Sequence, residues 1–274
     1  MWYGHIGFLV VSLTLALLAT GCVAQAIYHP TGAIRHTPEH ARLAYEDVSF
    51  SARDGVTLSG WWIPSENPRG TVLFCHGNGG NVSSCLDSVV MINELGLNLL
   101  LFDYRGYGRS NGSPSEQGTY ADADAAWDYL VNVRKIPPEQ VVVWGRSLGG
   151  PIAAKTASMR PAGLVVLEST FTSLPELVAD RFFRTPAWVL ANYAYDTRQH
   201  LGKVAAPVLV IHSPDDEVVP FSHARRLFDA IGSPRSFVQI SGDHNTGFIR
   251  SREAFQTALD GFISGHLSRQ EARQ

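Results

Sequence analysis

Short stretches rich in apolar residues recur along the chain from residue 48 onward, separated by polar or glycine-rich sequence. Stretches of this kind, with many branched and aromatic residues, predict β-strands. Asp54-Gly55 lies between the first two of them and is typical of a hairpin turn. We expect strands at residues 48–51, 57–63, 71–75, 97–102, 141–144, 164–167, 208–211 and 236–240.

Stretches with helical spacing of apolar residues lie between the later strands. The predicted helices cover residues 82–95, 116–134, 147–159, 221–231 and 249–267. A strand that alternates with a helix along the chain normally pairs in parallel with the next strand. The continuous apolar run at 141–144 is typical of a strand buried on both faces. The pattern therefore predicts an α/β domain over residues 45–267, with a mostly parallel sheet of about eight strands and helices on both faces.

One connection is too long for a simple loop. About 40 residues separate residue 167 from residue 208, whereas most connections in α/β domains are far shorter. We expect a small helical cap at about 170–204. Its aromatic residues either pack against the sheet or line an apolar substrate slot. These residues are Phe171, Phe182, Phe183, Trp188, Tyr193 and Tyr195.

The N-terminal segment has a different character. Residues 1–24 contain no Asp, Glu, Lys or Arg, and residues 6–18 are nearly all apolar. This apolar run matches the core of a secretory signal, whereas a membrane span needs roughly 20 residues. Residues 19–22 (Ala-Thr-Gly-Cys) resemble the lipobox of bacterial lipoproteins, in which the cysteine is lipidated.

The lipobox resemblance implies a signal peptide at 1–21, a lipid on Cys22, and an exported protein anchored to a membrane. An uncleaved anchor at residues 6–24 is the alternative. Residues 22–44 contain Pro30 and Pro38 and are expected to form an irregular tether, and residues 268–274 a polar tail.

The composition and charge of the chain limit the classes of molecule that it is expected to bind. Hydrophobic residues make up 45% of the chain and charged residues 17%, which is enough apolar material for a large core. The net charge is -3 and Lys and Arg form no stripe, so we expect no nucleic-acid partner. Cys75 and Cys85 are expected to be buried free thiols, with a disulfide between them as the alternative that export permits, and their spacing does not indicate a metal site.

A candidate nucleophile lies at residues 145–149 (Gly-Arg-Ser-Leu-Gly). A serine hydroxyl is a weak nucleophile unless a base removes its proton and the backbone presents it in a sharp turn. The Gly-x-Ser-x-Gly pattern between a strand and a helix provides that turn. Because the predicted strand at 141–144 precedes it and the predicted helix follows it, Ser147 is the candidate.

A serine of this kind needs a histidine base and an acid that orients it, in the order serine, acid, histidine. His244 follows the last predicted strand and precedes the last helix, so its imidazole can reach the carboxyl edge of the sheet. The acid would come from the loop at 212–220, in which Asp215, Asp216 and Glu217 are adjacent. Spacing alone does not choose among these three carboxylates.

Five ordered segments together resemble the α/β-hydrolase superfamily. They are residues 76–81 (His-Gly-Asn-Gly-Gly-Asn), 103–110 (Asp-Tyr-Arg-Gly-Tyr-Gly-Arg-Ser), 145–149, and the loops at 212–220 and 241–245. The resemblance covers roughly residues 45–266. It is closest to the small-capped branch, which includes membrane-associated depalmitoylase-like and serine-aminopeptidase-like hydrolases.

In that branch the acid loop reads His-Gly-x-x-Asp, which implies Asp216 as the acid. Ser213 stands where the branch has glycine, so Asp215 stays an alternative, and Glu168 is a further one if the acid follows the preceding strand. The resemblance also implies an oxyanion hole made by the backbone amides of Asn78 and Leu148. Three other groups are expected to be structural: Asn81 as a helix cap, the turn at 105–108 as a support, and Arg146 as a packing or ion-pairing residue.

These residues together predict a serine hydrolase that cleaves an ester or thioester through an acyl-enzyme, with no metal or organic cofactor. The aromatic cap and the expected location near a membrane favour a small-molecule or lipid-like substrate with an apolar acyl group. A serine peptidase of the aminopeptidase type is the catalytic alternative. A hydrolase fold that only binds a ligand is the alternative from another class.

Overall fold

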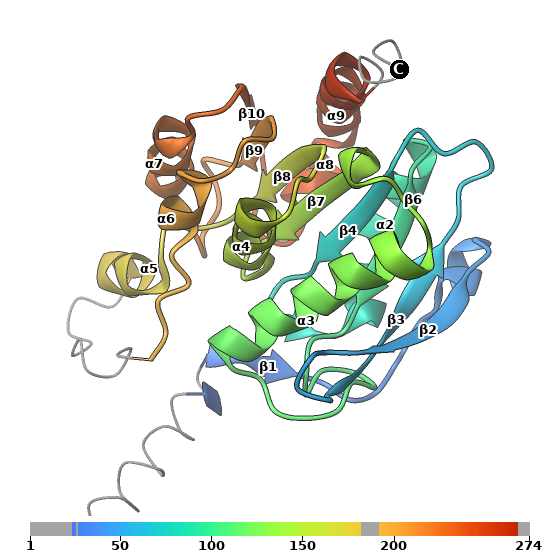
Figure 1. Ribbon diagram of the computed structural model, residues 1–274. Coiled ribbons are helices and arrows are strands. Elements are labelled where there is room, and N and C mark those ends of the chain that lie inside the picture. Colours follow the sequence, from blue (N-terminus) through green and yellow to red (C-terminus); the bar gives the residue numbers. More distant parts are fainter. Residues whose placement is uncertain (1–23, 26, 182–191, 268–274) are drawn as a thin grey trace, which may run out of the picture.

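All eight stretches predicted as strands lie in one sheet of the computed structural model, which describes residues 24, 25, 27–181 and 192–267 (Figure 1). Its spatial order is β10-β9-β8-β7-β4-β6-β3-β2. β2 and β3 are antiparallel to their neighbours, and the strands from β6 to β10 are parallel. The α/β-hydrolase fold is therefore confirmed. In chain order the strands are β2 (Glu46–Ser51), β3 (Thr57–Ile63), β4 (Thr71–Cys75), β6 (Asn98–Phe102), β7 (Val141–Arg146), β8 (Leu164–Glu168), β9 (Val208–His212) and β10 (Arg235–Gln239).

Helices follow the strands at the predicted places. The helix predicted at 116–134 changes to a wider π turn in its last part, and the one predicted at 249–267 is divided at Ser251. The α-helices are α2 (Leu86–Glu94), α3 (Glu116–Asp128), α4 (Gly149–Met159), α5 (Leu174–Arg181), α6 (Thr197–Leu201), α7 (Phe221–Ala230), α8 (Gly247–Arg250) and α9 (Arg252–His266). The shorter turns are η1 (Pro38–Ala41), η2 (Val82–Cys85), η3 (Tyr129–Val133) and η4 (Pro138–Gln140).

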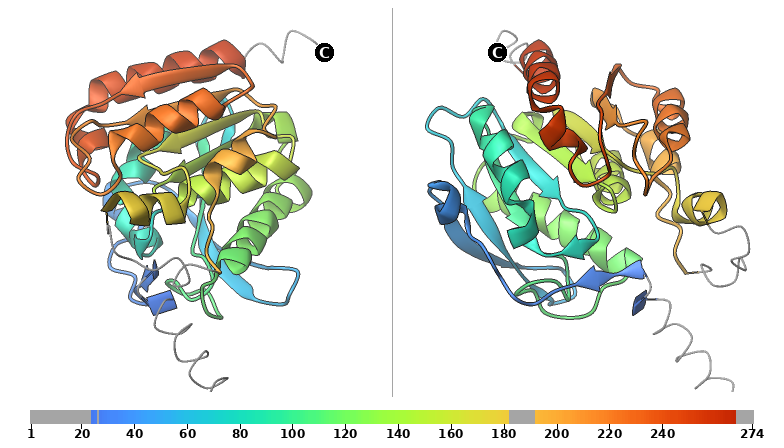
Figure 2. Two further views of the ribbon diagram at one scale, coloured as in Figure 1. Left: turned by 90° about the vertical axis from the view of Figure 1, so that its left-hand side faces the viewer. Right: turned by 180° about the vertical axis from the view of Figure 1, so that it is seen from behind.

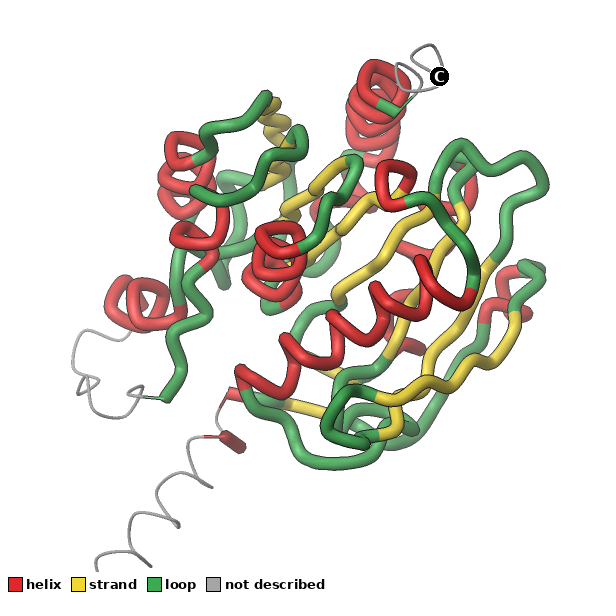
Figure 3. The backbone as a smooth tube through the Cα atoms, viewed as in Figure 1, coloured by secondary structure: helices red, strands yellow, loops and turns green. Residues whose placement is uncertain are grey.

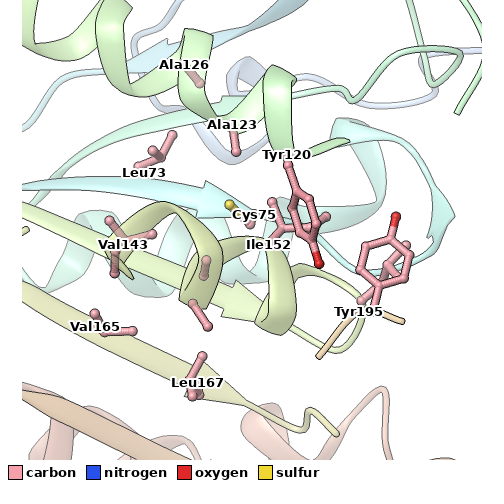
Figure 4. Packing of buried hydrophobic residues seen from close by; sticks show 14 of the residues in the cluster. Leu73, Cys75, Tyr120, Ala123, Ala126, Val143, Ile152, Val165, Leu167 and Tyr195 are labelled. Carbon is pink, nitrogen blue, oxygen red and sulfur yellow. The ribbon is translucent and has the colours of Figure 1, made fainter. Parts of the chain in front are cut away.

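The helices cover both faces of the sheet, as Figures 2 and 3 show. Consecutive side chains of a strand point to opposite faces, and β7 shows the consequence. Val141 and Val143 pack in one core with residues of α3, α4 and α7, whereas Val142 and Trp144 pack in another with residues of α2 and α9. Figure 4 shows part of the first core. Burial on both faces explains why the middle positions of the central strands are apolar without alternation, while polar residues stand only at strand ends.

The segment expected to be a loose tether is packed against the domain. Tyr28 is only 3% exposed, and β1 (His29–Pro30) pairs in parallel with β5 (Gly79–Gly80). The side-chain amide of Asn81 donates hydrogen bonds to the carbonyl groups of Thr31 and Ala33. The packed unit therefore includes residues from 27 onward, because a buried tyrosine and paired backbone hold an otherwise irregular segment in place.

The described part of the predicted cap region, residues 170–181 and 192–204, contains two short helices, α5 and α6. On α5, Glu176 and Asp180 form ion pairs with Arg226 of α7 at 2.8 Å each. Of the six aromatic residues noted there, Tyr193 and Tyr195 are buried in the core and Phe171 lines a cavity. Phe182, Phe183 and Trp188 lie outside the described residues.

The predictions for both ends of the chain also fall outside the described residues. These are the signal peptide at 1–21, the lipidation site at Cys22 and the polar tail at 268–274. Among the helices that the structure does describe, none combines the length and the apolar character needed to cross a membrane.

The close contact of α4 with the end of β4 generates a stability prediction. A methyl group on Gly149 would overlap the carbonyl oxygen of Cys75, so Gly149→Ala should lower the free energy of unfolding by about 2 kcal/mol or more. Gly261→Ala is the control, because Gly261 on α9 has open space around its Cα. That control should gain up to about 1 kcal/mol from helix propensity. Urea unfolding measures both, and equal loss in the two variants would contradict the packing argument.

Candidate active site

Ser147 lies in the sharp turn between β7 and α4, at the carboxyl edge of the sheet. Its φ is 52°, a left-handed conformation that costs energy in a residue other than glycine. The turn closes because its neighbours are glycines: a methyl group on Gly145 would overlap the carbonyl of Gly149, and one on Gly150 would overlap the hydroxyl of Thr170. The predicted elbow therefore forms as the Gly-x-Ser-x-Gly pattern indicates.

Thr170 supports the elbow, and the sequence analysis did not find it. Its hydroxyl donates a hydrogen bond of 2.7 Å to the carbonyl oxygen of Ser147. The backbone amide of Gly150 donates to the same oxygen at 2.9 Å, and the amide of Ser147 donates to the carbonyl of Glu168 at 3.0 Å. These bonds hold the strained residue in place. A hydroxyl three residues after a predicted strand is too common to have pointed to this contact.

His244 connects Ser147 to Asp216. The Nε2 atom of His244 lies 3.0 Å from the Oγ of Ser147, and its Nδ1 atom lies 2.8 Å from Oδ2 of Asp216. If the carboxylate accepts the Nδ1 proton, Nε2 is left as the acceptor that faces the serine hydroxyl. The three residues come from separate loops, so the fold brings together groups that are 97 and 28 residues apart.

Asp216 is the one of the three adjacent acidic residues that is buried. Burial alone would raise its pKa, but the hydrogen bond and charge of His244, the amide of Val219 and the nearby His212 hold that pKa below its usual value. Its Oδ1 accepts hydrogen bonds from the amides of Val218 and Val219, at 2.9 and 2.7 Å. Asp216 is thus kept ionised beside the imidazole.

The alternative acids lie elsewhere. Asp215 is exposed and accepts a hydrogen bond of 3.3 Å from the amide of Gly242, and Glu217 accepts one of 3.0 Å from the amide of His244. Both carboxylates contact the backbone of the histidine loop, and the structure places neither beside the imidazole nitrogens.

Glu168 pairs with Arg146 instead of the histidine ring. Its carboxylate lies 3.5 Å from the guanidinium of Arg146 and accepts a hydrogen bond of 3.0 Å from the indole of Trp144. Arg146 also donates to the carbonyl groups of His244 and Asn245 and stacks over the ring of Phe248. The ion pair agrees with the packing or ion-pairing role that the sequence indicated for Arg146, and its bonds to the histidine loop add a further role, because they fasten that loop to the end of β7.

The expected oxyanion residues lie on both sides of Ser147. Leu148 is the residue at the N-terminus of α4, where backbone amides favour negative charge. Asn78 lies in the turn after β4, and a methyl group on its neighbour Gly77 would be 3.6 Å from the Cβ of Ser147. Both residues line one cavity with Ser147 and His244. Asn81 caps η2, since its side chain accepts a hydrogen bond from the amide of Ser83.

A buried polar cluster supports the turn after β4. Asp103 accepts a hydrogen bond of 2.8 Å from the amide of Val82, and its Oδ1 lies 3.9 Å from Nε2 of His76. Tyr104 donates a hydrogen bond to the carbonyl of His76 at 3.0 Å. Burial raises the pKa of Asp103 to about 7 and lowers that of His76 to about 4. The turn at 105–108 contacts this turn through Tyr107, whose hydroxyl donates a hydrogen bond of 2.9 Å to Oδ1 of Asn78, and Arg105 fixes it by ion pairs with Asp54 and Asp122.

The cavity beside Ser147 has a volume of about 960 Å³. One side of it is apolar, and Cys85 and Arg181 also reach it. Among the described residues, no three histidine, cysteine, aspartate or glutamate side chains are arranged to hold a metal ion. The apolar side is formed by Ile27, Phe171, Leu174, Leu177, Val178 and Val219.

Comparison with known proteins agrees with this geometry. Residues 70–206 match the model of the alpha/beta hydrolase fold family. The chain belongs to the α/β-hydrolase family. This α/β hydrolase is 36% identical to the uncharacterized protein Rv2307c of Mycobacterium tuberculosis, over 93% of this chain and 95% of the relative.

Two further proteins are similar to this α/β hydrolase. The alpha/beta hydrolase domain-containing protein WAV2 of Arabidopsis thaliana is 34% identical, over 80% of this chain and 78% of WAV2. The structure of the Pyrococcus furiosus esterase Pf2001 is similar in fold, with a TM-score of 0.73 and 21% identity, and covers 87% of this chain and 99% of the esterase.

The raised pKa of Asp103 predicts a pH-dependent stability. Between pH 4 and 7 the folded protein keeps a proton on Asp103 that the unfolded chain releases, so the contribution of Asp103 to stability falls as the pH rises through this range, while the lowered pKa of His76 acts in the opposite direction in both proteins compared. From pH 4.5 to 7.5 this loss should be about 2 to 3 kcal/mol. Asp103→Asn, which keeps an acceptor for Val82, should lack it. Urea unfolding at several pH values tests this, and parallel curves for the two proteins would show the expected charge effect to be absent.

Proposed function

We propose that this α/β hydrolase cleaves carboxylic esters or thioesters through an acyl-enzyme formed on Ser147. The observation that carries the proposal is the continuous hydrogen-bonded chain from the Oγ of Ser147 through His244 to the buried Asp216. In a serine hydrolase these groups act as nucleophile, base and orienting acid. The strained turn at Ser147 supports the same role, because backbone strain of this kind is concentrated at functional sites.

The reaction proceeds in two halves. Ser147 Oγ bonds to the carbonyl carbon while His244 Nε2 takes its proton, and the amides of Asn78 and Leu148 hold the oxyanion. The tetrahedral intermediate then collapses: the bond to the alcohol or thiol breaks, and His244 gives its proton to the leaving group. A water molecule next attacks the acyl-enzyme while His244 takes one of its protons. The acid leaves, and the proton returns to Ser147.

The lining of the cavity supports an apolar acyl group. The aliphatic and aromatic side chains from α5 and its flanks offer contacts to a hydrocarbon chain, and the volume of about 960 Å³ is at the upper end for small-ligand pockets. The Pyrococcus furiosus protein that is similar in fold is an esterase, which supports the same class of reaction. A thioester of a fatty acid, as in the depalmitoylase-like branch, fits this lining.

We further propose that the protein is exported and anchored by a lipid on Cys22. The support is the sequence of residues 1–22, in which an apolar stretch without charges leads to a cysteine that follows small residues. A diacylated cysteine holds a protein on a membrane durably, because each buried methylene contributes about 0.8 kcal/mol. The substrate would then be met at a membrane surface.

The proposed triad is tested with matched variants. A fluorophosphonate probe should label the wild-type protein and not Ser147→Ala. Asp216→Asn should lower kcat on p-nitrophenyl esters by about 10³-fold to 10⁴-fold, because the imidazole loses the group that fixes its tautomer. Asp215→Asn is the control next to it in the sequence and should stay within about threefold of wild type, since its carboxylate contacts only a backbone amide.

Two results would overturn these assignments. Folded wild-type protein that resists the fluorophosphonate probe and hydrolyses none of the esters and thioesters would exclude the proposed reaction. A larger loss of kcat in Asp215→Asn than in Asp216→Asn would show that Asp216 is not the orienting acid.

The proposed lipid anchor predicts covalent labelling of Cys22. Bacterial cells that express the full chain and receive radiolabelled palmitate should yield labelled protein, and Cys22→Ala should abolish the label. Cys85→Ala is the matched control and should keep it, because Cys85 lies inside the folded domain. Label that persists in Cys22→Ala, or a wild-type protein that takes up none, would rule out this anchor.

A further inference from the structure

We infer that the N-terminal segment 27–29 is part of the substrate site, with Ile27 as a specificity-determining residue for the acyl chain and the side chain of Asn78 as a positioning group. This inference rests on the proposed ester hydrolysis and assigns a function to a segment that the sequence indicates only as a tether. Ile27 and His29 line the same cavity as Ser147 and the apolar residues of α5. The segment therefore forms one wall of the cavity.

The wall is joined to the proposed oxyanion turn by the side chain of Asn78. Its amide nitrogen donates a hydrogen bond to the carbonyl of Ile27, and its Oδ1 accepts one from the amide of His29 at 3.3 Å. The hydroxyl of Tyr107 donates to the same Oδ1 at 2.9 Å. One carboxamide thus binds the backbone on both sides of Tyr28, while the backbone amide of the same Asn78 is the proposed oxyanion donor.

The adjacent backbone continues this connection. His29 and Pro30 pair with Gly79 and Gly80, which directly follow Asn78 in the chain. The amide of Thr31 donates to the carbonyl of Gly80 at 3.0 Å. A displacement of the N-terminal segment would therefore act on the turn that holds the oxyanion.

Tyr28 fixes the wall from the other side. Its side chain is buried, and its hydroxyl lies 2.7 Å from that of Tyr195, which in turn lies 2.9 Å from the hydroxyl of Thr119 on α3. The rings of Tyr193 and Tyr195 contact the Tyr28 ring edge to face. Tyr28 is part of the core while Ile27 and His29 on either side of it line the cavity, so the segment has one buried side and one side toward substrate. Two polar attachments and a buried aromatic ring make this a fixed wall.

The chemistry of the wall indicates which part of the substrate it meets. Ile27 is apolar and partly buried, and it shares the cavity with Phe171, Leu174 and Leu177. A hydrocarbon chain that fills the cavity would remove Ile27 from water. A larger side chain at this position would take up that volume and exclude long acyl chains before short ones.

The test uses the full chain with Ile27→Trp, and Val133→Trp as the size-matched control. Val133 is 63% exposed on η3 and is not among the residues that line the cavity. On p-nitrophenyl esters from acetate to dodecanoate, Ile27→Trp should lower kcat/KM for decanoate and dodecanoate at least tenfold more than for acetate. Val133→Trp should keep the wild-type profile. An unchanged profile in Ile27→Trp overturns the inference.

A binding measurement separates this inference from the proposed reaction. In the Ser147→Ala background, calorimetric titration with decanoate should give a Kd that Ile27→Trp raises at least tenfold and that Val133→Trp leaves unchanged. If that difference appears although the protein with Ser147 intact hydrolyses no ester, the proposed reaction fails and the wall stands. If decanoate binds equally well to all three proteins, or to none of them, the wall is not an acyl site.

The positioning role of Asn78 is tested by the separation of kcat from KM. Asn78→Ala should lower kcat on the acetate ester about tenfold with KM within twofold, because the oxyanion forms only in the transition state. It should also reduce the chain-length effect of Ile27→Trp at least threefold in the double variant, since the wall is no longer held. A purely structural role would lower the urea midpoint with kcat retained, and that result would exclude the positioning role.

Discussion

No side chain fits between the first turn of α4 and the end of β4. Gly149 lies directly against the carbonyl of Cys75, and Gly145 lies against the carbonyl of Gly149. This contact brings the start of α4 and the turn after β4 to either side of Ser147, and Ser147 has a positive φ in the turn between β7 and α4. The arrangement of the site depends on this close approach, because any residue larger than glycine at these two positions would push the backbone segments apart.

Two buried carboxylates near this edge of the sheet have pKa values shifted in opposite directions. Asp216 accepts two backbone amides and faces an imidazole, so its charge is compensated and its pKa is lowered. The negative charge of Asp103 is stabilised less by its hydrogen bonds and neighbouring charges, and burial raises its pKa to about 7. Environments that separate the pKa values of like groups also separate their roles. Asp216 keeps its charge beside the proposed base, whereas Asp103 supports the neighbouring turn and is fully charged only above neutral pH.

The sequence predicted what is local or repeated. The strands were readable because burial on both faces makes them apolar throughout, and Ser147 because its glycines are adjacent to it. The choice of Asp216 over Asp215 needed a family resemblance, since spacing does not show which carboxylate is buried. Thr170 and the contacts of Arg146 with the histidine loop could not be predicted, because they join residues 23 to 99 positions apart. The docking of residues 27–31 was missed for a related reason: one buried tyrosine and two paired residues leave no period in the sequence.

The position of Ile27 in the cavity wall limits how far the catalytic domain can stand from its attachment. Four residues lie between Cys22 and Ile27, and the five extended steps of chain that join them span at most about 17 Å. With the proposed lipid on Cys22, this short connecting segment would keep the cavity close to the bilayer surface. The encounter with substrate would then be a search in two dimensions, and its rate would depend on the surface density of acyl groups more than on their concentration in solution.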